Sequence, residues 1–170
     1  MSDRKKLVII GGGPAGYVGA LRGAQLGAEV TLIEKKEVGG TCLNVGCIPT
    51  KTLTSTAHLF TLMKRAANWG IQVDSPTLNW TQVMRRKEQV VRRLVNGVKF
   101  LLKERKVNQI SGTASFLDER TLLINKTDGG IEKLEADLIL ICTGSVPIEL
   151  KIPGADLEGV VDSTGALCFD

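Results

Sequence analysis

The fold is decided by the stretch Leu7-Val8-Ile9-Ile10-Gly11-Gly12-Gly13-Pro14-Ala15-Gly16. Its four leading residues form a continuous apolar run, which is typical of a strand buried on both faces of a parallel sheet. The glycines and the proline end that strand, and residues 15–26 predict a helix closed by Gly27. Residues 29–33 repeat the apolar strand pattern. The order of strand, glycine turn, helix and strand predicts a βαβ unit in an α/β fold with a parallel sheet.

The glycine spacing in this turn, Gly11-x-Gly13-x-x-Gly16, predicts a dinucleotide-binding site. The first glycine permits the tight turn, the second lets a pyrophosphate approach the backbone, and the third lets helix and strand pack closely. Glu34 follows the second strand and is placed to accept hydrogen bonds from an adenosine ribose, which disfavours a ligand with a 2′-phosphate. The turn does not separate a flavin from a nicotinamide dinucleotide. The alternative, a glycine-rich packing turn, leaves Glu34 unexplained.

A second motif, Gly39-Gly40-Thr41-Cys42-Leu43-Asn44-Val45-Gly46-Cys47-Ile48-Pro49-Thr50-Lys51, contains two cysteines five residues apart. In a cytosolic protein, such a pair is more often redox-active or metal-binding than structural. Cys47 stands at a predicted helix start, where the helix N-terminus stabilises a thiolate. A thiolate facing an electron-poor ring could pass two electrons between a cofactor and a disulfide. The alternatives are two inert thiols, or half of a zinc site whose other ligands would come from Cys142, Cys168 or His58.

The rest of the chain predicts two helices, an antiparallel meander and two further strands. A loop is expected over residues 38–46, a helix over 49–67, and a long helix from an Asn79 cap to residue 106. The long helix should bury one face that carries Val83, Val90, Leu94, Val98 and Leu101. The predicted strands are 107–110, then 114–116, 121–125 and 131–134 in an antiparallel meander, and finally 137–142.

The composition is that of a soluble globular protein. Of 170 residues, 43% are hydrophobic and 24% are charged, which excludes a disordered, collagen-like or coiled-coil chain. The longest apolar runs are too short to cross a bilayer and no signal-peptide pattern is found, so a cytoplasmic protein is expected. Nine Lys and Arg lie between Asn79 and Lys106 against two Glu. Because only Trp80 and Phe100 are aromatic there, a solvated helix face is expected rather than a nucleic-acid site.

The cysteine segment resembles the redox-disulfide motif of the flavoprotein disulfide reductases, the pyridine nucleotide–disulfide oxidoreductases. Its residues from Cys42 to Pro49 are most similar to the dihydrolipoamide dehydrogenase branch, since glutathione and mercuric reductases more often have valine at Leu43 and Ile48. The resemblance extends over the whole chain. It implies a Rossmann-like FAD-binding fold, FAD as the bound cofactor, NAD as the electron acceptor, and dihydrolipoamide or a lipoyl domain as the substrate. It also implies a homodimer for the full-length parent, and no nucleic-acid or membrane partner.

The resemblance further implies roles for individual residues. Cys47 would be the charge-transfer thiol against the flavin, Cys42 the interchange thiol that attacks the substrate disulfide, and Lys51 would lie near the flavin N5. The other residues implied at the cofactor are Gly11, Gly13, Pro14, Ala15 and Gly16 at the pyrophosphate, Glu34 and Lys35 at the adenosine, Gly40 and Thr41 along the flavin path, Ala114 at the adenine, and Thr143, Gly144 and Ser145 closing over it.

The family's chain is longer than this one, so an incomplete fold is expected. It continues with a NAD-binding domain, a second FAD segment and an interface domain, whose His–Glu pair serves the partner's active site. His58 cannot replace that base, because 11 helical residues would put it about 16 Å from Cys47. The expected organisation is an FAD-binding domain at 1–147, with a redox-disulfide helix at 42–67, a long helix at 79–106 and a meander at 112–136, then a linker at 148–170 toward a missing NAD-binding domain.

Two other functions remain open at this point. One is a disulfide reductase of the glutathione or mercuric type. The other is a non-enzymatic dinucleotide-binding or thiol-sensing module. Whichever function is right, the 170 residues by themselves are expected to have little or no turnover. The reason is that the resemblance leaves the flavin site unfinished.

Overall fold

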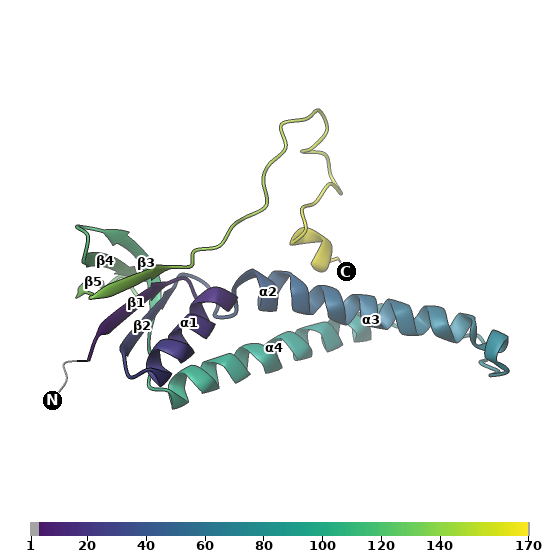
Figure 1. The fold of residues 1–170 in the computed structure, drawn as a ribbon. Helices are drawn as coiled ribbons and strands as arrows, with labels where there is room; N and C mark the ends of the chain where they lie inside the picture. The colour runs from purple at the N-terminus through teal and green to yellow at the C-terminus, as the bar shows by residue number, and fades with distance from the viewer. Residues whose placement is uncertain (1–3, 170) are drawn as a thin grey trace. The chain divides into compact units, whose positions relative to one another are not determined.

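The computed structural model describes residues 4–169, and the sheet within them has six strands in the order β5-β4-β3-β2-β1-β6 (Figure 1). The strands are β1 (Lys6–Ile10), β2 (Glu29–Glu34), β3 (Asn108–Phe116), β4 (Thr121–Lys126), β5 (Ile131–Glu135) and β6 (Leu138–Ile141). The pairs β1–β2, β1–β6 and β2–β3 are parallel, whereas β3–β4 and β4–β5 are antiparallel. The predicted α/β fold with a parallel sheet and an antiparallel meander is therefore confirmed. Residues 1–3 and 170, which the expected domain ranges include, lie outside the described residues.

The chain divides into two compact units. One comprises Met1–Asn44 with Leu94–Val146, and the other Val45–Arg93 with Pro147–Asp170. The helices are α1 (Pro14–Gln25), α2 (Gly40–Val45), α3 (Cys47–Lys64) and α4 (Trp80–Glu104), with 3-10 helices at Ala66–Trp69 and Gly165–Leu167. The first unit thus holds the sheet, α1, nearly all of α2 and the C-terminal part of α4, and the second holds α3 and the N-terminal part of α4.

Each face of the sheet buries its own apolar cluster in the first unit. One cluster joins the sheet to α1 and α4, and the other joins the parallel strands to the meander. The first includes Ile9, Ala20, Leu32 and Leu102, and the second includes Val8, Ile33, Leu122 and Ile124. Successive residues of β1 therefore point to opposite buried faces, as the continuous apolar run at the N-terminus predicts.

One strand serves both halves of the sheet, which corrects the prediction of separate strands at 107–110 and 114–116. Residues 108–111 of β3 pair in parallel with β2, and residues 112–116 pair antiparallel with β4. Gly112 lies at the changeover, where a Cβ would come within 2.5 Å of the Asn125 carbonyl oxygen. Glycine at this position lets the strand run on without a break while β4 approaches closely.

Val83 of the predicted α4 face is buried, as predicted, but further along the helix the buried positions differ by one residue from the predicted ones. Leu94 and Leu101 are 38% and 48% exposed, whereas Val95 and Leu102 are buried. Val98 packs against the first cluster, as predicted. Two adjacent rows of the helix are both apolar, so helical spacing alone does not decide which row faces the sheet.

The N-terminus of α4 is capped as predicted, and the cap gives a stability prediction. The Asn79 Oδ1 atom accepts a hydrogen bond from the Gln82 N–H at 3.0 Å. Asn79→Ala should lower the free energy of unfolding by about 1 kcal/mol, because that amide loses its acceptor. Asn79→Asp keeps the acceptor and should stay close to wild type. Urea unfolding followed by circular dichroism measures both, and equal losses in the two variants would contradict a capping role.

Two helices replace the loop and the single helix that were predicted around the cysteines. The predicted loop at 38–46 contains α2, and the helix predicted at 42–67 is interrupted at Gly46 and ends at Lys64. Gly46 has φ −147° and ψ −107°, well outside the helical region, so the chain cannot continue one helix through it. Pro49 lies in the first turn of α3, where its missing N–H needs no partner, but the helix begins two residues before it.

The strand predicted at 137–142 is β6, and it lies beside β1 at an edge of the sheet. Asp137 fixes its start, since the carboxylate accepts a hydrogen bond from the Lys6 N–H at 2.8 Å and pairs with the Lys5 ammonium at 3.5 Å. The hydrogen bond from Lys6, followed by the charge of Lys5, lowers the pKa of Asp137. Cys142 follows the strand, is half-buried, and packs against the first apolar cluster.

Candidate functional site

The glycine turn between β1 and α1 is closed by backbone contacts that only glycine permits. Gly11 has φ +103°, and its N–H donates to the Ile33 carbonyl at 2.8 Å. A Cβ on Gly11 would overlap the carbonyl oxygen of Cys142, and a Cβ on Gly16 would overlap the carbonyl oxygen of Gly11. The first and last glycines of the motif are thus required by close approach of the backbone.

The first turn of α1 presents backbone donors with no acceptor inside the helix. Pro14 is its first residue and has no N–H, and the amides of Ala15 and Gly16 precede the first intrahelical bond. The Tyr17 N–H donates to the Gly13 carbonyl at 2.9 Å. No side chain caps this helix end. Open amides at a helix N-terminus, where the helix dipole is positive, suit the pyrophosphate of a dinucleotide.

Glu34, at the end of β2, holds the turn through two backbone hydrogen bonds. Its Oε2 atom accepts from the Gly12 N–H at 2.6 Å, and its Oε1 atom accepts from the Lys36 N–H at 2.8 Å. Because a carboxylate offers about four acceptor positions, these bonds leave room for the hydroxyls of a ribose. Glu34 therefore orders the turn and still offers free acceptor positions.

Glu34→Ala is expected to lower the free energy of unfolding by about 1–3 kcal/mol, because the buried Gly12 amide loses its acceptor. Glu29→Ala is a matched control at the exposed start of the same strand, and it should stay within about 0.5 kcal/mol of wild type. Urea unfolding of the two variants checks the difference. Equal stabilities would mean that the turn does not depend on Glu34.

Two other segments lie against the glycine turn in the first unit. Gly40 has φ +55°, and a Cβ there would lie 2.7 Å from the Gly13 Cα, so the start of α2 packs directly on the turn. This contact brings the exposed Thr41 near the turn. The close approach of Gly11 to residues 142 and 143 does the same for the exposed segment of Thr143, Gly144 and Ser145.

The two cysteines lie on successive helices. Cys42 is the third residue of α2 and is half-buried, and Cys47 is the first residue of α3 and is exposed. The predicted position of Cys47 at a helix start is confirmed. Lys51 follows one turn later on α3, and His58 is also exposed on that helix. Cys47, Lys51 and His58 belong to the second unit, so the first unit groups only Cys42 with the glycine turn.

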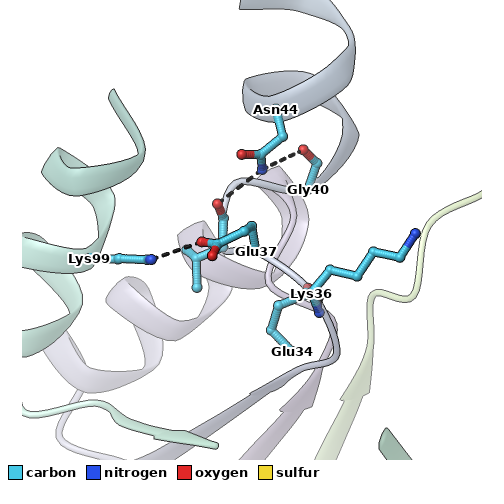
Figure 2. Close-up of polar contacts among 7 residues, drawn as sticks. Glu34, Lys36, Glu37, Gly40, Asn44 and Lys99 are labelled. Atoms are coloured by element: carbon cyan, nitrogen blue, oxygen red, sulfur yellow. Dashed lines mark hydrogen bonds and ion pairs between the residues drawn. The ribbon is translucent and has the colours of Figure 1, made fainter. Parts of the chain in front are cut away.

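A small cavity beside Glu34 is lined by residues for which the sequence predicts no role in the site. Its volume is about 120 Å³, and its lining includes Lys36, Glu37, Lys99, Gln109 and Ser111. Figure 2 shows the Lys99 ammonium pointing to the Glu37 carboxylate, and the two atoms lie 2.8 Å apart. These two residues are 62 positions apart in the sequence, so their contact can be predicted only once the order of the strands is known.

Lys35 and Ala114 lie close in the sequence to residues that line this cavity. Lys35 is exposed directly after β2. Ala114 is half-buried on β3, three residues beyond Ser111, which pairs with Glu34 in the sheet. Both residues predicted at the adenosine end thus lie in the first unit, Lys35 directly after Glu34 and Ala114 on the strand that pairs with β2.

The described part of the chain contains neither a cluster of metal-ligating side chains nor a helix able to cross a membrane. Among residues 4–169, no three His, Cys, Asp or Glu side chains gather closely enough to hold a metal ion. None of the helices formed by those residues has the length and apolar character needed to cross a bilayer.

Comparison with known proteins identifies relatives over nearly the whole chain. The family model described as pyridine nucleotide-disulphide oxidoreductase matches residues 5–168. The dihydrolipoyl dehydrogenase of Bacillus subtilis is 48% identical over 95% of this chain and 35% of its own length. The dihydrolipoamide dehydrogenase of Chaetomium thermophilum is 44% identical over 98% of this chain and 33% of its own. This chain therefore spans about a third of these relatives.

A solved structure shows the same fold. The HOCl-induced flavoprotein disulfide reductase RclA of Escherichia coli, in its Cu(II) complex, matches with a TM-score of 0.77 and 32% identity. The match covers 98% of this chain and 35% of the RclA chain. The Rossmann-like α/β architecture is thus that of the FAD-binding domain of disulfide reductases.

Proposed function

We propose that this chain, which belongs to the pyridine nucleotide-disulphide oxidoreductase family, is the FAD-binding and redox-disulfide part of a dihydrolipoamide dehydrogenase-like enzyme. The observation that carries the proposal is the glycine turn, packed against the helix that holds Cys42. Residues 1–147 would form the FAD-binding part, and residues 148–170 would form a linker toward a NAD-binding domain.

The residues of the first unit fit FAD. Gly11, Gly16 and Gly40 let neighbouring backbone pack closely around the turn. At Gly13 an added Cβ would meet only the Gly40 Cα, at 3.8 Å, so this glycine leaves the outer side of the turn open to a pyrophosphate. The amides of Ala15 and Gly16 would hold the phosphates, and Glu34 would hold the ribose. Pro14, Gly13, Thr41 and the segment 143–145 adjoin the same turn, with Lys35 and Ala114 toward the adenosine.

The cysteine pair would carry the first redox step. A substrate dithiol gives up two electrons and two protons and becomes a disulfide, while the bond between Cys42 and Cys47 is reduced to two thiols. Cys42 would exchange with the substrate sulfur, and Cys47, at the start of α3, would be the thiolate that the helix N-terminus stabilises. Lys51 places a positive charge one turn further along that helix. FAD, when bound, supplies a two-electron acceptor for the reduced pair and a donor to NAD.

The substrate, the final electron acceptor and the assembly are properties of the whole protein. Dihydrolipoamide, free or on a lipoyl domain, would be the substrate, NAD the final acceptor, and the assembly a cytoplasmic homodimer without nucleic-acid or membrane partners. Support for the substrate comes from the names of the relatives at 48% and 44% identity. The residues 42–49, with leucine and isoleucine at 43 and 48, favour the same branch.

A reductase of the glutathione or mercuric type is the second candidate, and substrate comparison separates the two. The full-length protein should form NADH from dihydrolipoamide and NAD much faster than it consumes NADPH with glutathione disulfide or mercuric ion. The reverse order would reject the dihydrolipoamide assignment. FAD binding without turnover on any of these substrates would favour a non-enzymatic dinucleotide-binding or thiol-sensing module.

A further inference from the structure

We propose that Asn44 is a positioning residue that holds the start of α2 against the glycine turn. The inference rests on the proposed dinucleotide site and concerns the segment that joins Glu34 to Cys42. The Asn44 Nδ2 atom donates to the Val38 carbonyl at 3.2 Å and to the Gly40 carbonyl at 3.0 Å, and both bonds are drawn in Figure 2.

Such a restraint matters here because the segment contains two consecutive glycines, which lose more conformational entropy on folding than other residues. Gly39 and Gly40 have φ values of +102° and +55°, which glycine adopts readily but which cost it more conformational entropy than other residues. The Asn44 amide bridges the carbonyls of Val38 and Gly40, one on each side of Gly39. A single side chain thereby fixes the orientation of the two peptide groups on either side of Gly39, a residue type with the largest conformational freedom to lose.

Two contacts define what this bridge holds in place. The Gly39 N–H donates to the Gly12 carbonyl at 2.8 Å, and Gly40 packs directly on Gly13. Both partners belong to the turn that would bind the pyrophosphate. Cys42 lies two residues before Asn44 on the same short helix, so the bridge also fixes the course of the chain that carries this thiol.

The amide chemistry of asparagine is specific to this task. Nδ2 carries two hydrogens and here meets two carbonyl oxygens, so both donors are used. An aspartate of the same size would place an acceptor against two acceptors and leave no void. The Lys99–Glu37 ion pair restrains the same segment, but its side chains are 46% and 61% exposed, and exposed pairs contribute little.

The test compares Asn44→Asp with Asn96→Asp, which makes the same exchange at an exposed position of α4. In Asn44→Asp, the Gly39 and Leu43 amides should exchange hydrogen about tenfold faster, while amides of β1 and β2 keep their rates. FAD should bind about tenfold more weakly. The rate at which Cys42 is alkylated, measured relative to the rate for Cys168, should differ from the wild-type value. Asn96→Asp should match wild type in all three measurements.

Wild-type exchange rates and wild-type FAD affinity in Asn44→Asp would overturn the inference. Faster exchange throughout β1 and β2 would overturn it as well, because the effect would then be a general loss of stability. If Asn44→Asp does not fold, Asn44→Ser, which keeps one donor, should show the same local pattern. A wild-type protein that binds no FAD would refute the proposed function, whereas the exchange of Gly39 would still decide the role of Asn44.

Discussion

Cys47→Ser is expected to reduce turnover of dihydrolipoamide with NAD by at least about a thousandfold while FAD remains bound. A serine hydroxyl can neither form a disulfide with Cys42 nor ionise near neutral pH, so the first redox step has no acceptor. The glycine turn and Glu34 belong to the other compact unit and are unchanged by the exchange. Steady-state rates and the flavin absorbance of one full-length preparation measure both effects.

Cys168→Ser is the matched control for that variant. Cys168 is exposed, like Cys47, and lies outside the cysteine motif. It should keep wild-type turnover and wild-type flavin content. Substantial dithiol oxidation by Cys47→Ser, or an equal loss in Cys168→Ser, would refute the assignment of the redox pair.

Gly16→Ala should weaken FAD binding by at least about tenfold and destabilise the fold by about 1–3 kcal/mol. The added Cβ would overlap the Gly11 carbonyl oxygen and come within 2.9 Å of the Gly11 carbonyl carbon. Neither atom belongs to a side chain that could rotate away. The turn must therefore open at the point where the pyrophosphate would approach it. Flavin fluorescence titration and urea unfolding measure the two losses.

Gly97→Ala is the control for a methyl group added within a helix. No atom lies within 4 Å of the Cβ that it would introduce in α4. Alanine forms helices better than glycine, so this variant should gain about 0.5–1 kcal/mol of stability and keep its affinity for FAD. If Gly16→Ala binds FAD as tightly as Gly97→Ala, the close approach at the turn is not required for binding.

The local patterns of the sequence predict the parts of the fold that depend on neighbouring residues. The run from Leu7 to Gly16 predicts β1, the turn and the start of α1, because burial on both faces, close backbone approach and helix initiation all act there within ten residues. Asn79 likewise predicts the start of α4, since capping involves only the next few amides. Cys47 at the start of α3 belongs to the same class of local feature.

The features that the sequence does not predict depend on contacts between distant segments. Leu94 and Leu101 are as apolar as Val95 and Leu102, and only tertiary packing decides that the second pair is buried, with Leu102 in the cluster against the sheet. The Glu37–Lys99 pair needs the order of the strands to be known first. Asn44 lies within the cysteine motif, but the sequence predicts no role for it, because its two acceptors, the Val38 and Gly40 carbonyls, come together only when Gly39 and Gly40 adopt positive φ.

The visible absorption spectrum of the purified full-length protein, before and after one equivalent of a dithiol, tests the central claim most directly. The account predicts a flavin spectrum that gains a long-wavelength charge-transfer band on reduction, and Cys47→Ser should keep the flavin but lose that band. A full-length protein without flavin absorbance, or a band that persists in Cys47→Ser, would contradict the assignment of this chain as the FAD-binding and redox-disulfide part of the enzyme.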